Sequence, residues 1–262
     1  MNVALCFSGK LGEWHESRDS IVENIINPLK PDIFLSTWID EDYLDFINFY
    51  NAKKFICKEY KLSIKEVDFS KFDCEPNAGL IPMLLNMYYV NKIKNDYEKT
   101  NNIKYDLVIR LRPDVQVLEQ IKPHEIKDCI QSRCIRLPFF ESDNIYDHEE
   151  ELKKEFCFSF IYDKASLPDQ INDQIAIGPT EEMNKYMTCV KNIEQTINYM
   201  WQDGYPEYMI KVPESVFTLQ LQRKNCRYKK LTGTNSFGNI KTLLCKDGIK
   251  WRNKGHNSIQ YN

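Results

Sequence analysis

The 262-residue sequence predicts an α/β fold in which a mainly parallel sheet is flanked by helices on both faces. Short apolar runs that suit strands alternate with longer segments of helical periodicity through the first half of the chain. These runs are of the kind found in strands that are buried on both faces. Strands and helices in this order typically build a parallel sheet, because each helix carries the chain back across the sheet.

The elements of the first half can be assigned in order along the chain. Residues 3–7 (VALCF) form a short strand that ends at a Ser-Gly turn, and 17–29 has apolar residues at helical spacing. Pro28 and Pro31 close this helix. The next expected elements are a strand at 32–38, a weaker strand at 64–69, a helix at 79–98 and a strand within 106–117 (DLVIRLRPDVQV).

The second half of the chain is less regular. Strands are expected at 134–140 and 155–162, and helices at 181–201 and 213–225. The last thirty residues are polar and aromatic, which predicts an irregular C-terminal extension lying over the domain. No repeat or low-complexity linker divides the chain, so a single domain is expected.

The composition limits the classes of partner. Charged residues make up 28% of the chain, and the formal net charge of −3 comes from interspersed residues of both signs. No nucleic-acid partner is therefore expected, because such proteins carry a basic surface. No apolar stretch is long enough to span a bilayer, and the N-terminus lacks the features of a signal peptide, which predicts a cytoplasmic protein with no transmembrane segment.

Nine cysteines occur without a single Cys-x-x-Cys pair. An odd number of cysteines in a chain expected in the cytoplasm favours reduced, mostly buried thiols over disulfides or a metal site.

The strand within 106–117 ends in three charged residues, Arg110, Arg112 and Asp114. A buried strand rarely carries such charges for packing, because each costs several kcal/mol unless it is paired or solvated. Two interpretations stay open. One is an internal Arg–Asp ion pair, and the other has the arginines facing a polyphosphate while Asp114 binds a divalent metal or sugar hydroxyls.

Three further segments could carry chemistry. The loop after the first strand, residues 7–14 (FSGKLGEW), could offer backbone N–H groups to an anion or form an ordinary tight turn. Asp173 and Gln174 suit sugar hydroxyls or proton removal from an alcohol, and a helix cap or Asx-turn is equally compatible with them. His256 is either a metal ligand or a surface residue.

Five segments in order along the chain resemble a family of small glycosyltransferases that occur in bacterial polysaccharide loci and in large DNA viruses. They are VALCFSGKLGEW, NIINPLKPDIFLSTW, YDLVIRLRPDV, DQIAIGPTEEMNKY and PESVFTLQL, and together they span about residues 2–225. The resemblance implies a GT-A-like (Rossmann-like) fold over 1–262. Residues 1–118 would form the nucleotide-binding half, and 119–262 the acceptor side with the C-terminal extension.

The resemblance also implies roles for individual residues. In this family an Asp-x-Asp motif holds Mn²⁺ or Mg²⁺ against the diphosphate, but here Arg112 replaces the first aspartate, so the need for a divalent metal stays open. The implied metal ligands are Asp114 and His256, and the implied catalytic residues are Asp173 and Gln174. The donor-binding candidates are Ser8, Gly9, Lys10, Thr37, Trp38, Tyr88, Asn91, Arg110 and Arg112.

The function expected from the sequence is therefore transfer of a hexose or pentose from a nucleotide-diphosphate sugar, most often a UDP-sugar in this family, to a hydroxyl of a glycan acceptor. The product would belong to a polysaccharide or a glycoprotein glycan. Two alternatives stay open: a sugar nucleotidyltransferase, and a catalytically inactive protein of the same fold that binds glycan or nucleotide.

Overall fold

The computed structural model describes residues 1–39, 42–60, 65, 67–117, 119–137, 174–230 and 240–242. The strands are β1 (Val3–Ser8), β2 (Asp32–Trp38), β3 (Lys54–Lys58), β4 (Leu107–Leu111), β5 (Val115–Val117), β6 (Ile135–Leu137), β7 (Ile175–Gly178), β8 (Tyr228–Lys230) and β9 (Ile240–Thr242). The helices are α1 (Trp14–Ile21), the π-helical η1 (Val22–Ile26), α2 (Asn27–Leu29), α3 (Tyr43–Tyr50), the 3₁₀ turn η2 (Phe69–Lys71), α5 (Leu80–Asn101), α6 (Pro123–Ser132), α8 (Thr180–Met187), α9 (Ile193–Gln202), α10 (Glu207–Ile210) and α11 (Pro213–Arg223).

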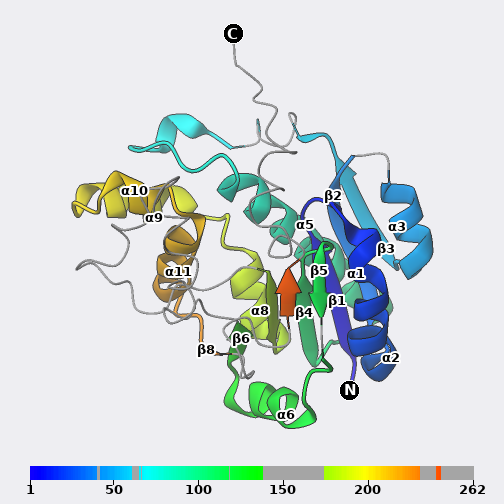
Figure 1. The fold of residues 1–262 in the computed structure, drawn as a ribbon. Coiled ribbons are helices and arrows are strands. Elements are labelled where there is room, and N and C mark those ends of the chain that lie inside the picture. The colour runs from blue at the N-terminus through cyan, green and yellow to red at the C-terminus, as the bar shows by residue number, and fades with distance from the viewer. Residues whose placement is uncertain are drawn as a thin grey trace, which may run out of the picture.

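Seven strands form one sheet in the order β3-β2-β1-β4-β7-β6-β8 (Figure 1). The first four are parallel to one another, and β8 is parallel to β6. Strand β7 is antiparallel to both β4 and β6. Among the seven described strands of this sheet, it therefore runs in the opposite direction to the other six. The predicted mainly parallel α/β sheet is confirmed. Strands β5 and β9 pair separately as a two-stranded antiparallel sheet.

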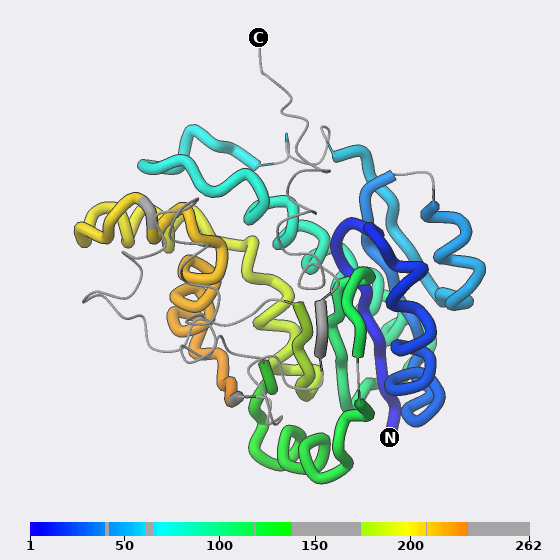
Figure 2. Tube along the Cα trace, in the orientation of Figure 1, coloured from blue at the N-terminus to red at the C-terminus, as the bar shows by residue number. Residues whose placement is uncertain are grey.

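The middle of the sheet brings together segments that are distant in sequence. Strand β1 pairs with β2 on one side and with β4 on the other, and Figure 2 shows these segments side by side. Every residue of β1 and β4 is buried, as expected for strands covered on both faces. The register places Ser8 opposite Ser36 and Phe7 opposite Leu111, so the carboxyl ends of these three strands lie at one edge.

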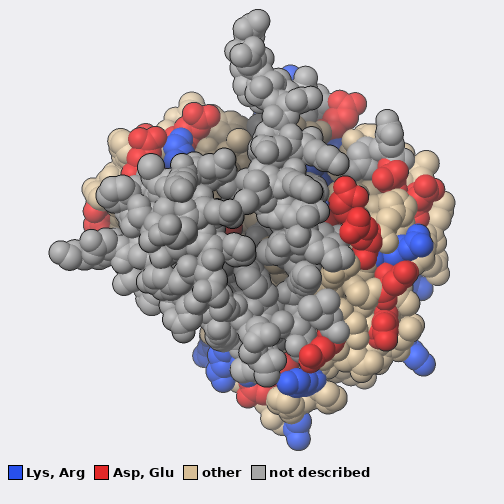
Figure 3. Space-filling view, viewed as in Figure 1, with Lys and Arg blue, Asp and Glu red and all other residues tan. Residues whose placement is uncertain are grey.

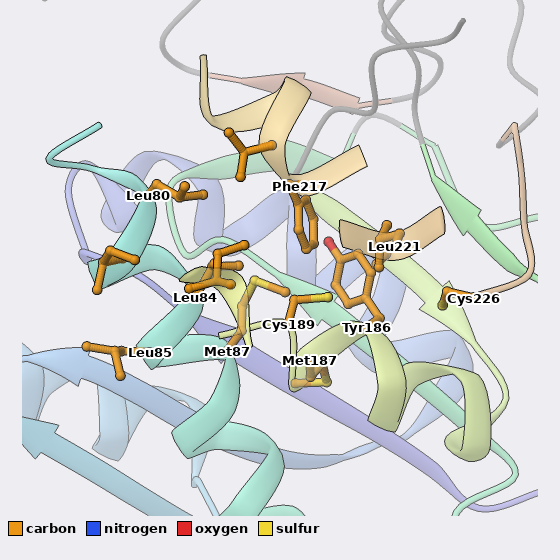
Figure 4. Packing of buried hydrophobic residues seen from close by; sticks show 14 of the residues in the cluster. Leu80, Leu84, Leu85, Met87, Tyr186, Met187, Cys189, Phe217, Leu221 and Cys226 are labelled. Carbon is orange, nitrogen blue, oxygen red and sulfur yellow. The ribbon is translucent and has the colours of Figure 1, made fainter. Parts of the chain in front are cut away.

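Helices cover both faces of the sheet, and a hydrophobic cluster fills each side. Alternate residues of β1 face the two clusters, as the pleat of a strand requires. One cluster contains buried residues of α1, α3 and α6. The other contains residues of α5, α8, α9 and α11, and Figure 4 shows how Tyr186 of α8 packs against Phe217 of α11, with ring centroids 5.0 Å apart.

Helix α5 runs opposite to the strands that it covers. Near its beginning, Asn86 lies 2.8 Å from the hydroxyl of Ser36, at the carboxyl end of β2. Near its end, Glu98 accepts a hydrogen bond from the backbone N–H of Tyr105, just before β4 begins. The first turns of α5 therefore lie toward the edge of the sheet at which β1, β2 and β4 end.

The third strand does not lie where the sequence predicts it. The described residues of 64–69 form turns and the beginning of η2, whereas the strand next to β2 is β3. Strand β3 lies at the edge of the sheet, and its first two residues, Lys54 and Phe55, are exposed. An edge strand of this kind lacks the continuous apolar run that marks the buried strands.

The other predicted elements differ mainly at their ends. The expected helix at 17–29 begins at Trp14 and includes the π-helical turn. The strand predicted within 106–117 is divided at Pro113 into β4 and β5, because proline cannot continue a sheet ladder. The helix expected at 181–201 is divided into α8 and α9. The strand predicted at 155–162 lies outside the described residues.

Seven of the nine cysteines lie in the described residues, and all seven are free thiols. Six of them are buried, which agrees with the prediction of reduced core thiols, while Cys157 and Cys245 lie outside the described part. Burial raises the pKa of Cys6, two residues before the end of β1, to about 12. This thiol therefore stays neutral at pH 7 and is unsuited to act as a nucleophile.

Figure 3 shows that lysine and arginine side chains are mixed with carboxylates on the described part of this face. This mixture agrees with the small formal net charge of −3. Among the described helices, none combines the length and apolar character that crossing a bilayer demands.

Candidate functional site at the carboxyl edge of the sheet

The order of the strands marks one position at the edge of the sheet. After β1 the chain passes to β2 on one side, whereas β4 lies on the other side of β1. In open α/β sheets, ligands bind beyond the carboxyl ends of the strands at the point where the strand order reverses. The ends of β1 and β4 and the residues that follow them lie at this position, and they contain six of the thirteen candidate residues: Ser8, Gly9, Lys10, Arg110, Arg112 and Asp114.

A buried arginine ties the ends of β1 and β4 together. The side chain of Arg110 is enclosed, with 1% of the residue exposed. Its Nε donates to the hydroxyl of Ser8 at 2.7 Å, and its Nη2 donates to the carbonyl oxygen of Ser8 at 3.3 Å. Because a buried guanidinium must find acceptors, these contacts fix Ser8 and the start of the loop after β1.

The loop after β1 turns back toward both neighbouring strands. Gly9 has φ +126 and its N–H donates to the carbonyl of Ser36 in β2 at 3.2 Å. Gly12 has φ +53, and a Cβ added there would lie 3.3 Å from the Cβ of Asp114. The second glycine therefore allows the loop to pass directly over the aspartate that follows β4, which a side chain would obstruct.

Arg112 and Asp114 form a two-pronged ion pair just beyond β4. Nε of Arg112 donates to Oδ1 of Asp114 at 2.9 Å, and Nη2 donates to Oδ2 at 2.6 Å. The Asp114 side chain is 7% exposed and that of Arg112 is 28% exposed. The internal ion pair that the sequence left open is therefore present, and the guanidinium is its more accessible member.

The backbone around this ion pair is held on both sides. The N–H of Arg112 donates to the carbonyl of Gln174 at 3.0 Å. The hydroxyl of Ser17, in the first turn of α1, donates to the carbonyl of Pro113 at 2.5 Å. Because β7 runs against its neighbours, its amino end reaches the carboxyl edge of the sheet, and this brings Gln174 beside Arg112.

The remaining donor candidates lie at the end of β2, in the loop after β1 and in α5. Thr37 and Trp38 end β2 and are buried, and no hydrogen-bond partner is found for the Thr37 hydroxyl. Lys10 is exposed. In α5, Asn91 is buried, and the ring of Tyr88 lies 5.2 Å from Nζ of Lys191. The donor-binding roles of all these residues stay predictions.

Two predicted site residues, Asp173 and His256, lie outside the described residues. The proposed roles of both therefore stay predictions. Gln174, the neighbour of Asp173, is half-buried, and its carbonyl accepts from the N–H of Arg112. Gln174 therefore lies at the edge of the sheet where Arg112 and Asp114 lie.

The described residues do not fit a divalent cation as they lie. Mg²⁺ and Mn²⁺ need carboxylate oxygens, and both oxygens of Asp114 accept hydrogen bonds from Arg112. In the part of the chain that the structure describes, no three His, Cys, Asp or Glu side chains gather in a way that could hold a metal ion. The metal role of Asp114 stays a prediction, and no chemical step is derived through a metal.

Three residues that shape this site were not among the predicted ones. Gly12 is the second glycine of the loop, and this repetition is a signal that the sequence carries. Ser17 follows Trp14 by one helical turn and gives no distinctive pattern. Ser36 follows three apolar residues of β2, 33–35, and this change to a polar residue could have pointed to a contact at the end of the strand.

A separate pocket lies at the opposite edge of the sheet. It has a volume of about 410 Å³. Its lining includes Lys30, which precedes β2, Asp32, the first residue of β2, and Lys53, which precedes β3. Ligand sites in parallel sheets lie beyond the carboxyl ends of the strands, and this pocket lies at their amino ends. The carboxyl edge between β1 and β4 is therefore the better candidate.

Comparison with known proteins gives limited further information. No protein-family model matches the sequence, and no curated protein matches it at a significant level. Among solved structures, the chain is similar to mouse xyloside xylosyltransferase 1 in its apo form, at 10% sequence identity and a TM-score of 0.47. The similarity covers 88% of this chain and 84% of that chain. A likeness at this TM-score carries no argument about function, so the function is inferred from the residues of the site.

Proposed function

We propose that this protein is a glycosyltransferase that moves a sugar from a nucleotide-diphosphate donor, most simply a UDP-sugar, to a hydroxyl of a glycan acceptor. One observation carries the proposal. The loop after β1, the ion pair after β4 and the beginning of β7 meet at the point where the strand order reverses. These are the segments through which the sequence resembles glycosyltransferases.

The chemistry of such a transfer suits the groups that gather there. The bond between the anomeric carbon and the diphosphate oxygen breaks, and a bond from the acceptor oxygen to that carbon forms. The leaving diphosphate gains negative charge, which guanidinium groups and backbone N–H groups stabilise. The acceptor hydroxyl loses its proton to a base, and Asp173 is the residue proposed for this step.

Binding and turnover of donor test this proposal. We expect UDP to bind with a dissociation constant in the micromolar range or weaker, about −8 kcal/mol or less favourable, by calorimetry. We also expect UDP release from at least one UDP-sugar, faster in the presence of an acceptor saccharide. Pyrophosphate formed from a nucleoside triphosphate and a sugar phosphate would instead indicate a nucleotidyltransferase. Binding without any release would indicate an inactive relative, and no binding of any nucleotide diphosphate would contradict the proposal.

Gly12→Ala provides a test of the loop. A side chain at φ +53 costs about 1–2 kcal/mol of stability, and the new Cβ would press on Asp114. Gly204 also has a positive φ, +78, but a Cβ there would meet no atom within 4 Å, so Gly204→Ala is the matched control. Both variants should lose stability in thermal unfolding, Gly12→Ala by the larger amount because of its contact with Asp114, while only Gly12→Ala should weaken UDP binding in calorimetry. Equal UDP affinity in the two variants would remove this loop from the site.

A further inference from the structure

We propose that Arg112 takes the position of a divalent cation against the donor diphosphate, so that nucleotide binding at this site needs no metal ion. In this arrangement Asp114 is a positioning residue that holds the guanidinium. The inference rests on the proposed function and specifies which group of the site meets the phosphate charge.

The first argument comes from the geometry of the ion pair. The guanidinium meets both oxygens of Asp114, at 2.9 and 2.6 Å, and the carboxylate is the more deeply buried partner. Gly12 passes over the carboxylate from the side of the loop. A metal ion that approached Asp114 would have to displace the guanidinium or lie beside it, and two like charges at such distances repel each other.

The second argument comes from the rigidity of the backbone. Hydrogen bonds hold the N–H of Arg112, from Gln174 just before β7, and the carbonyl of Pro113, from Ser17 of α1. Proline itself fixes φ between the two members of the pair. A group held in this way before the ligand arrives loses little conformational freedom on binding, which favours affinity.

The third argument comes from charge and chemistry. A guanidinium stays protonated at any physiological pH, and it carries five N–H donors. Its planar fork also matches phosphate oxygens. Arg110 and Arg112 together outweigh Asp114, so these three side chains leave the end of β4 with a net charge of +1. The positive charge left over among these three side chains suits an anionic ligand better than an added cation.

The test compares UDP binding by calorimetry in EDTA and in Mn²⁺. We expect dissociation constants that agree within about threefold, and we expect Arg112→Gln to weaken binding about 10- to 100-fold, as for loss of a charged hydrogen bond. Asp114→Asn in EDTA should weaken binding less than Arg112→Gln, because its amide oxygen still accepts one hydrogen bond from the guanidinium. Arg136→Gln is the matched control, since Arg136 pairs with Asp128 between β6 and α6 and should not affect UDP binding.

Several results would overturn the inference. If UDP binds only in the presence of Mn²⁺, the inference is wrong and the proposed function stands. The same conclusion follows if Asp114→Asn loses more UDP affinity than Arg112→Gln. Failure of UDP and other nucleotide diphosphates to bind under both conditions would remove the proposed function together with this inference. If Arg112→Gln does not fold, the comparison of EDTA with Mn²⁺ for the unaltered protein decides alone.

Discussion

Replacing Asp173 by asparagine is expected to lower kcat by about 10²- to 10⁴-fold with little change in donor affinity, which is the usual contribution of a general base. A hydroxyl attacks slowly unless a base takes its proton, and asparagine cannot do so at neutral pH. Gln174, the next residue, lies at the carboxyl edge, where its carbonyl accepts from the N–H of Arg112 at 3.0 Å. Measuring kcat and the donor dissociation constant of this one variant tests the assignment.

The same two measurements separate the alternative roles of Asp173. If the carboxylate only hydrogen-bonds the donor sugar, the variant should bind donor more weakly and lose less turnover. If it caps a turn, both constants should stay near those of the unaltered protein, because asparagine caps about as well as aspartate. Asp203→Asn is the control, since Asp203 lies at the end of α9, where it accepts from the hydroxyl of Tyr199 at 3.3 Å. Unchanged kcat and affinity for Asp173→Asn would remove this residue from the site.

Replacing Glu98 by glutamine is expected to lower the free energy of unfolding by about 3–5 kcal/mol, because it leaves a buried charge without its counterion. Lys94 of α5 has no exposed side-chain surface, and its Nζ lies 3.0 Å from Oε2 of Glu98. Its other polar contact is with Oδ1 of Asn184 in α8, at 3.3 Å. Glutamine keeps the acceptor for the N–H of Tyr105 but loses the negative charge.

A second lysine–glutamate pair gives the control for this variant. Lys104 and Glu181 lie 3.3 Å apart, and their side chains are 70% and 65% exposed. Exposed pairs of this kind contribute about 0–1 kcal/mol, so Glu181→Gln should be nearly neutral. Urea unfolding of both variants measures the difference directly. Similar losses in the two variants would show that the buried pair does not stabilise the packing of α5 on α8.

The central strands could be predicted because burial on both faces leaves a clear pattern in the sequence. Residues 3–7 are a continuous apolar run and 33–35 form the apolar centre of 32–38, and both segments are strands in the structure. Strand β3 carries lysine at both ends and lies at the edge of the sheet, so it lacks this pattern. The direction of β7 could not be predicted either. A run of four apolar residues is compatible with a parallel or an antiparallel strand, and the direction is determined by the pairing with β4.

The candidate site was predicted in part. The charges of Arg110, Arg112 and Asp114 were identified at a strand end, because charged groups there need a partner or a ligand. Their separate roles depend on contacts between distant segments. The hydroxyl of Ser8 accepts from Arg110, and Gly12 lies against Asp114, and the local sequence does not identify the partner in either contact. The pairing of Arg112 with Asp114 was one of two open interpretations, and this pair is present in the structure. The phosphate contact of the other interpretation stays a prediction.

A crystal structure of the protein with UDP tests the central claim most directly. The account predicts diphosphate density at the carboxyl edge of the sheet, between the loop containing Gly9 and Gly12 and the guanidinium of Arg112. Density at the opposite edge, in the pocket lined by Lys30 and Lys53, would contradict it. The absence of density at the carboxyl edge in crystals saturated with UDP would contradict it equally.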